Sequence, residues 1–157
     1  MVGREPKTSH PPFYKTQKIM TQFKQKTYSE GDKSVFLNFI GALAGFILKA
    51  KNLHWAAPKK NIHVYLDEFH DILGDYQDAL AEGYMGILGQ MGPNDVPYKE
   101  CRDDNANSFI ESVLTATKEF YGQIPEGSEF KGITGETESF IQNVNKYNYL
   151  FHLCDAV

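Results

Sequence analysis

Four side chains in the middle of the chain have the types and spacing of metal ligands: His63, Asp67, Asp78 and Glu82. Their separations of four, eleven and four residues place all four within one stripe roughly 100° wide on a single α-helix. Neutral imidazole binds Fe(II) and Zn(II) well, whereas carboxylates suit harder cations and the ferric ion. The pattern therefore predicts an iron site that leaves coordination positions open for water, O₂ or peroxide.

The same four residues are arranged symmetrically along the chain. His63 and Glu82 are centred between residues 72 and 73, and so are Asp67 and Asp78. If two copies of this helix cross antiparallel about a two-fold axis at that point, His63 of each copy faces Glu82 of the other. An isologous dimer of this kind contains two identical mixed-ligand sites. The alternative interpretation is that acidic residues four apart on a helix simply form a solvated face.

Further residues extend the candidate site. His54 lies nine residues before His63, across an expected turn that contains Pro58, and could supply a ligand from the preceding helix. Trp55 would give the site an oxidisable aromatic neighbour. His70 shares the symmetry centre with Asp75, and two interpretations stay open for it: a structural residue or an auxiliary ligand.

At these residues the sequence resembles the Dps family, the DNA-protecting mini-ferritins of bacteria, and it looks most like the ferritin-like proteins encoded by some tailed bacteriophages. In Dps proteins a His-Trp pair ends the first helix, and a His, two Asp and a Glu at the same spacings line the second. The resemblance covers about residues 34 to 90. The stretch from His54 to His63 is three residues shorter than the usual Dps spacing.

The resemblance implies a fold, a site and an activity. The fold would be an all-α, ferritin-like four-helix bundle, and the site would combine residues of two subunits across a dyad. One subunit would supply His54, His63 and Asp67, and its mate Asp78 and Glu82. The substrate would be iron, Fe²⁺ oxidised to Fe³⁺ by peroxide or O₂, with zinc as a substitute metal. The ferric product would be stored inside a homo-oligomer, a dodecameric shell in Dps proteins, which protects against oxidative stress.

Composition bounds the class of protein. A chain of 157 residues with 41% hydrophobic content is long enough for one domain with a substantial core. Its two cysteines, Cys101 and Cys154, do not indicate a disulfide framework, and no signal peptide is evident before residue 34. The apolar run 34–48 is too short to cross a membrane and indicates a buried helix. We therefore expect a cytoplasmic protein, in a bacterium or a phage-infected host cell, with no membrane partner.

Charge divides the chain into two expected parts. Residues 1–33 hold seven Lys or Arg and three Asp or Glu, a balance of +4, whereas the remainder holds nine and 17, a balance of −8. We interpret residues 1–33 as a basic N-terminal arm and residues 34–157 as the bundle. The arm has two interpretations: weak nucleic-acid contact through its lysines, or a tail that packs on a neighbouring subunit or stays disordered.

Apolar spacing predicts four helices, from 32 or 34 to 54 or 55, over 61–88, from 105 or 108 to 121, and over 134–153. Residues 89–104 are rich in Gly and Pro and predict a long crossover between the second and third helices. Sixteen extended residues span up to about 50 Å, enough to return along the second helix, which is roughly 40 Å long. Gly41 and Gly45 suggest that another helix comes close there.

Two alternatives to an iron oxidase follow from the same residues. The chain could be a non-catalytic, ferritin-like structural or interaction protein, for example in a phage particle. It could also compact DNA through its N-terminal arm. Bound iron or zinc in a large closed assembly would favour the oxidase, whereas a metal-free monomer or dimer would favour the structural protein.

Overall fold

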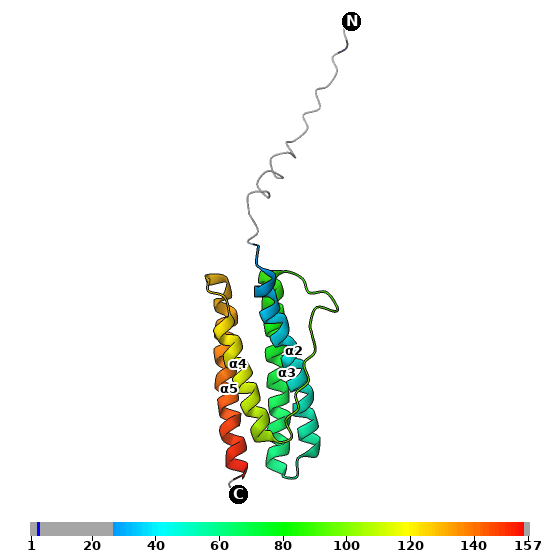
Figure 1. Ribbon diagram of the computed structural model, residues 1–157, viewed down its shortest axis with the longest axis vertical. Coiled ribbons are helices and arrows are strands. Elements are labelled where there is room, and N and C mark those ends of the chain that lie inside the picture. Colours follow the sequence, from blue (N-terminus) through cyan, green and yellow to red (C-terminus); the bar gives the residue numbers. More distant parts are fainter. Residues whose placement is uncertain (1–2, 4–26, 156–157) are drawn as a thin grey trace.

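The computed structural model describes residue 3 and residues 27–155. Within these residues the chain forms four α-helices and one short 3-10 helix, with no strand. The elements are α2 (Glu30–Ala56), α3 (Lys60–Leu88), α4 (Ala106–Gln123), η1 (Ser128–Phe130) and α5 (Lys131–Asp155). Figure 1 shows the four helices side by side, with α2 and α5 descending and α3 and α4 rising. The predicted all-α four-helix architecture is confirmed.

The first helix begins earlier than Asp32 or Ser34, the two predicted caps. Ser29 caps α2 because its hydroxyl accepts a hydrogen bond from the Asp32 backbone N–H at 3.1 Å, and the Asp32 carboxylate accepts one from the Ser29 N–H at 3.2 Å. Residues 30–33 of the expected arm therefore belong to α2. Apart from Gly3, residues 1–26 of the arm lie outside the described residues, and so does its expected contact with nucleic acid.

The connection between α3 and α4 is long and lies along the bundle. It descends beside α2, so that α4 starts at the same end of the bundle as α3 and runs parallel to it (Figure 1). The Lys99 N–H donates a hydrogen bond to the Gly41 carbonyl at 3.2 Å. A Cβ atom on Gly41 or Gly45 would overlap the backbone carbonyls of Pro97 or Lys99. Because Gly41 and Gly45 have no side chain, the extended crossover can pack directly against α2. The sequence predicted a neighbouring helix at this point, and that prediction was wrong.

Aromatic rings fill the core and fix how each helix is rotated. Tyr76 of α3 stacks on Phe140 of α5 with ring centroids 4.0 Å apart, and Phe39 of α2 stacks on Phe120 of α4 at 4.2 Å. The Tyr76 hydroxyl lies 2.8 Å from the Thr137 hydroxyl, and burial raises the pKa of Tyr76. Six residues of α3 are buried in this core: Leu66, Phe69, Leu73, Tyr76, Leu80 and Tyr84. Their burial turns the opposite face of α3 outward.

The most apolar helix is α2. By length and composition it could cross a membrane, and half of the residues in its apolar window are buried inside the bundle. Phe36 and Leu43 of this helix are fully buried. The segment therefore has the burial expected for a core helix of a bundle.

Candidate metal centre

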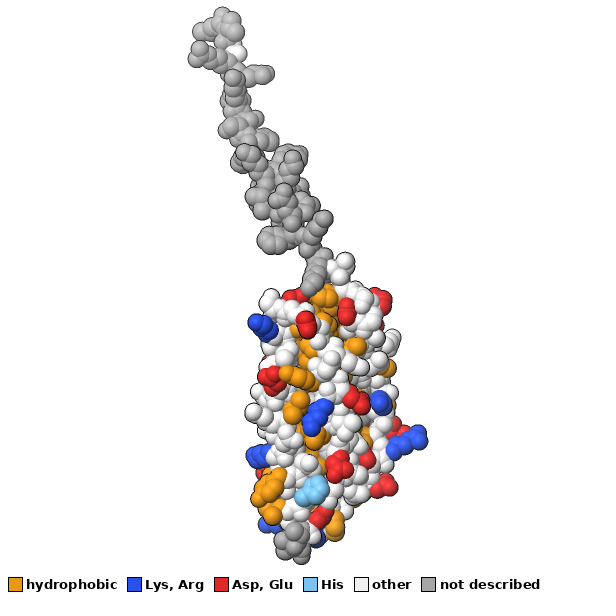
Figure 2. All heavy atoms as spheres, turned by 60° about the vertical axis from the view of Figure 1, so that its left-hand side comes forward, with side chains coloured by type: hydrophobic (Ala, Val, Ile, Leu, Met, Phe, Trp, Pro, Cys, Tyr) orange, Lys and Arg blue, Asp and Glu red, His pale blue; other side chains and the backbone are white. Residues whose placement is uncertain are grey.

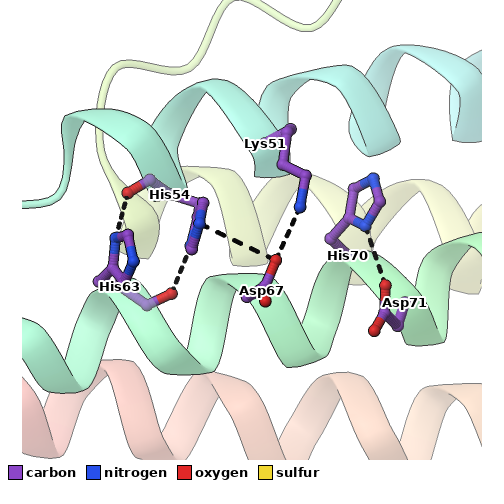
Figure 3. A network of polar contacts seen from close by, with 6 residues as sticks. All are labelled: Lys51, His54, His63, Asp67, His70 and Asp71. Atoms are coloured by element: carbon purple, nitrogen blue, oxygen red, sulfur yellow. Dashed lines mark hydrogen bonds and ion pairs between the residues drawn. The ribbon is translucent and has the colours of Figure 1, made fainter.

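Two histidines meet where α2 ends and α3 begins. The rings of His54 and His63 stack with centroids 3.7 Å apart. Each Nδ1 lies close to the backbone carbonyl of the other residue, at 2.7 Å from His54 to the His63 carbonyl and 2.8 Å in the reverse direction (Figure 3). The shortened turn therefore still brings the two imidazoles together.

These reciprocal hydrogen bonds determine which nitrogen of each ring is free. A carbonyl oxygen only accepts, so Nδ1 of each ring carries the proton and donates it. In the neutral imidazole the lone pair then lies on Nε2. Histidines that bind metals usually donate their other N–H to a carbonyl or carboxylate in this way, which fixes the orientation of the ring. The donor chemistry of His54 and His63 fits Fe(II) or Zn(II).

Asp67 lies one helical turn after His63 and close to His54. Its Oδ1 atom is 3.9 Å from Nε2 of His54, and 49% of its side chain is exposed. An N and an O atom bound to the same first-row metal lie roughly 3 Å apart, since each bond is about 2.1 Å long. A shift of roughly 1 Å would therefore let the two side chains share one ion.

Lys51 contacts the same carboxylate, which the spacing of the candidate ligands did not predict. Its ammonium Nζ lies 2.7 Å from Asp67 Oδ1 (Figure 3). The hydrogen bond from Lys51 holds the pKa of Asp67 below its ordinary value, and the charges of Lys51, His54 and His70 act in the same direction against partial desolvation. The sequence does carry a signal, because Lys51 precedes His54 by three residues and so lies on the same side of α2.

Replacing Lys51 by Met should raise the pKa of Asp67 toward its ordinary value. A carboxyl group with a lowered pKa in the folded state stabilises the fold above its unfolded pKa, and this stabilisation is lost as the pH falls through the lowered value. The Lys51→Met variant should therefore lose less stability in acid than the parent chain. An NMR titration of the Asp67 side chain measures the shift, with Lys49→Met as the control. An unchanged Asp67 titration in Lys51→Met would contradict the role given to Lys51.

Asp78 and Glu82 lie further along α3, on its exposed face. Neither makes a hydrogen bond or ion pair with another residue in the described part of the chain. Asp78 follows Asp67 by eleven residues, which is about 16 Å along a helix, too far to bind the same ion. Within one chain the structure thus brings His54, His63 and Asp67 together and leaves Asp78 and Glu82 apart from them. Over residues 27–155 no three His, Cys, Asp or Glu side chains of one chain form a complete metal group.

The two auxiliary residues have different surroundings. Nδ1 of His70 lies 3.1 Å from the carboxylate of Asp71, its neighbour in sequence, and 25% of the His70 side chain is exposed. Figure 3 places His70 beside Lys51, between α2 and α3. Trp55 follows His54 directly and is 69% exposed. An indole exposed to this extent is accessible to an oxidant from solvent.

Comparison with known proteins finds no matching family model, no matching curated protein and no matching solved structure.

Proposed function

We propose that this protein is a Dps-like mini-ferritin that binds Fe(II) between two antiparallel copies of α3, oxidises it with peroxide or O₂, and stores the ferric product in a homo-oligomeric shell in the cytoplasm. The observation that carries the proposal is the pair of reciprocal hydrogen bonds between His54 and His63. They commit both Nδ1 atoms to carbonyl oxygens and leave both Nε2 atoms for a metal. The bond from His63 also satisfies a carbonyl in the last turn of α2, so the feature that favours a metal site is the pair of Nε2 atoms left without a proton.

The position of the acidic ligands supports a site between subunits. Asp78 and Glu82 are exposed on the same α3 face but cannot reach His63 or Asp67 of their own chain. An antiparallel second copy would bring Glu82 of the partner subunit to His63 and Asp78 of the partner subunit to Asp67. A Cβ atom on Gly74, next to the symmetry centre, would meet no atom within 4 Å. The surface at the proposed axis is therefore open to a close helix.

Each group has a distinct task in the oxidation. The two imidazoles supply neutral donors, and the three carboxylates balance the charge of the cation and favour the ferric product. Two Fe(II) ions give one electron each, which together reduce one peroxide to water or one O₂ to peroxide. When a single Fe(II) reduces peroxide by one electron, hydroxide and a hydroxyl radical form, and Trp55, which follows His54 in the chain, can reduce this radical by giving it one electron.

Stopped-flow oxidation of Fe(II) by the full-length protein tests the proposal. We expect oxidation by peroxide or O₂ to be faster than in protein-free buffer, and the iron to remain soluble with a large closed particle. A rate equal to that of buffer would contradict the proposal, whatever the particle size.

The ion pair between Lys51 and Asp67 favours a second candidate, a ferritin-like structural or interaction protein without turnover. At 2.7 Å the ammonium already neutralises the Asp67 carboxylate without a metal. For this candidate we expect purified protein to contain no metal, to remain a monomer or dimer, and to leave the rate of Fe(II) oxidation unchanged. DNA binding through the basic arm, residues 1–33, is a separate expectation, tested by a gel shift that is lost at moderate salt and on deletion of residues 1–30.

A further inference from the structure

The outward face of α3 is strongly acidic. Five carboxylates lie within an arc of roughly 80° on this helix: Asp67, Asp71, Asp75, Asp78 and Glu82. Four of them are exposed, and the fifth, Asp67, is half-buried, with 49% of its side chain exposed. In the described part of the chain, the ammonium groups on this face are Lys60 in the first turn of α3 and Lys51, which reaches over from α2. Five negative and two positive charges leave a balance of −3, counting histidines as neutral.

The face of the bundle toward α4 and α5 is not charged in this way. Figure 2 shows the side toward α4 and α5, where acidic and basic side chains are interspersed among apolar and uncharged ones. The acidic face lies on α3, the helix that carries His63, and His54 contacts this helix from the end of α2. The charge is thus concentrated on the surface that the proposed dimer would bury.

Pairing two copies through this face brings together both attractive and repulsive pairs of side chains. About the symmetry centre, His63 would face Glu82 of the partner subunit and His70 would face Asp75 of the partner subunit, which are complementary pairs. Asp67 would face Asp78 of the partner subunit, with Asp71 and Asp75 close by. Two copies of a face with a balance of −3 bring six net negative charges together, which opposes association. Two divalent cations supply four positive charges at this interface.

We propose that two copies of the chain pair through the acidic α3 face only when divalent transition-metal ions bind between His54, His63 and Asp67 of one copy and Asp78 and Glu82 of the other. This inference rests on the proposed function and adds to it that the same metal controls assembly. A ligand that binds the dimer and not the monomer stabilises the dimer, and pairing raises the affinity for the ligand by the same factor. Because each dimer takes two ions, pairing rises with about the square of the free metal concentration at low occupancy.

Because of this linkage, the fraction of paired chains depends on the free concentration of the metal that the protein binds. At a low concentration of free metal, repulsion between the carboxylates keeps the two chains apart, and the Lys51 ammonium forms its ion pair with the Asp67 carboxylate. At high free metal the ions replace the ammonium and join the two helices. The storage particle is then assembled when its substrate is abundant.

Sedimentation velocity of the full-length chain at micromolar concentration tests the inference. We compare chelator, Zn²⁺, Co²⁺ and Mg²⁺, since Zn²⁺ and Co²⁺ bind imidazole without being oxidised in the assay and Mg²⁺ prefers oxygen ligands. The dissociation constant of the dimer should fall at least about tenfold with Zn²⁺ or Co²⁺ and change little with Mg²⁺. A dimer equally tight in chelator and in Zn²⁺ would overturn the inference.

Two double variants separate charge from ligation. Asp71→Asn with Asp75→Asn removes four negative charges from each dimer and no ligand. An Asn at position 75 can still accept a hydrogen bond from His70, so the lower repulsion should make the dimer in chelator at least about tenfold tighter. Asp78→Asn with Glu82→Gln removes the same charge together with two ligands, so Zn²⁺ should no longer tighten the dimer. Equal responses of the two variants to Zn²⁺ would overturn the inference.

The outcomes also separate this inference from the proposed function. If the chain oxidises Fe(II) as a dimer that is equally tight in chelator, the metal-dependent assembly is wrong and the oxidase stands. If Zn²⁺ tightens the dimer but Fe(II) is oxidised no faster than in buffer, the oxidase is wrong and the metal-dependent assembly stands.

Discussion

Replacing Asp78 by Asn and Glu82 by Gln in one chain should slow Fe(II) oxidation at least about 100-fold. Both side chains are exposed and have no hydrogen-bond or ion-pair partner in the described part of the chain, so the fold loses nothing when they change. The proposed oxidation site would lose its two partner-subunit carboxylates, and with them the negative charge that favours the ferric product. Stopped-flow oxidation gives the rate, and circular dichroism should give an unchanged helical content and melting temperature.

The matched control for this variant lies on the same helix face. Asp71→Asn with Asp75→Asn removes two carboxylates that are also exposed and that lie outside the proposed ligand set; Asp71 contacts the His70 ring at 3.1 Å. Its oxidation rate should stay within about threefold of the parent chain, which is less than 1 kcal/mol in activation free energy. Equal losses in both variants would show that general charge matters and that Asp78 and Glu82 are not ligands.

Replacing Gly41 and Gly45 together by Ala should destabilise the bundle by about 3 kcal/mol. The new Cβ atoms would overlap the carbonyls of Pro97 and Lys99, so the crossover must move away from α2. That movement also breaks the hydrogen bond from the Lys99 N–H to the Gly41 carbonyl. The loss exceeds the gain in helix propensity, which is about 1 kcal/mol for each Gly→Ala change. Urea unfolding followed by circular dichroism measures the difference.

Gly86→Ala is the control for the glycine variant. Gly86 lies in the last turn of α3, and a Cβ atom there would meet nothing within 4 Å. This change should raise the free energy of unfolding by up to about 1 kcal/mol, or leave it unchanged. A Gly41→Ala, Gly45→Ala variant as stable as Gly86→Ala would mean that the crossover does not pack on α2 as described.

The helices could be predicted from the sequence because apolar residues recur along them at helical spacing. The second predicted helix, 61–88, differs from α3 by one residue at its start. The start of the first helix was less predictable, because Ser29, Asp32 and Ser34 are all acceptable caps and the reciprocal bonds of Ser29 with Asp32 decide between them. The role of Gly41 and Gly45 could not be predicted, because a close approach indicates a neighbouring backbone but not which segment supplies it.

The candidate site was predictable to a different degree. Helical spacing placed His63, Asp67, Asp78 and Glu82 on one side of α3, where the structure also has them. Spacing along the chain gives no ring orientation, so the stacked His54 and His63 and their Nδ1 hydrogen bonds appear only in three dimensions. Lys51 was missed for the same reason, since its contact with Asp67 joins two helices. The pairing of two copies of α3 stays a prediction.

A mixing experiment tests most directly whether two chains complete one site. One variant carries His63→Ala with Asp67→Asn, and the other carries Asp78→Asn with Glu82→Gln, so each alone lacks half of every site. In a hybrid dimer one site receives all four changes and the other receives none. Co-expression should therefore restore between about a quarter of the parent rate of Fe(II) oxidation, if chains pair at random, and about half, if metal-dependent pairing forms hybrids alone. Neither variant should oxidise iron by itself. No recovery in hybrids that are shown to form would contradict the shared site.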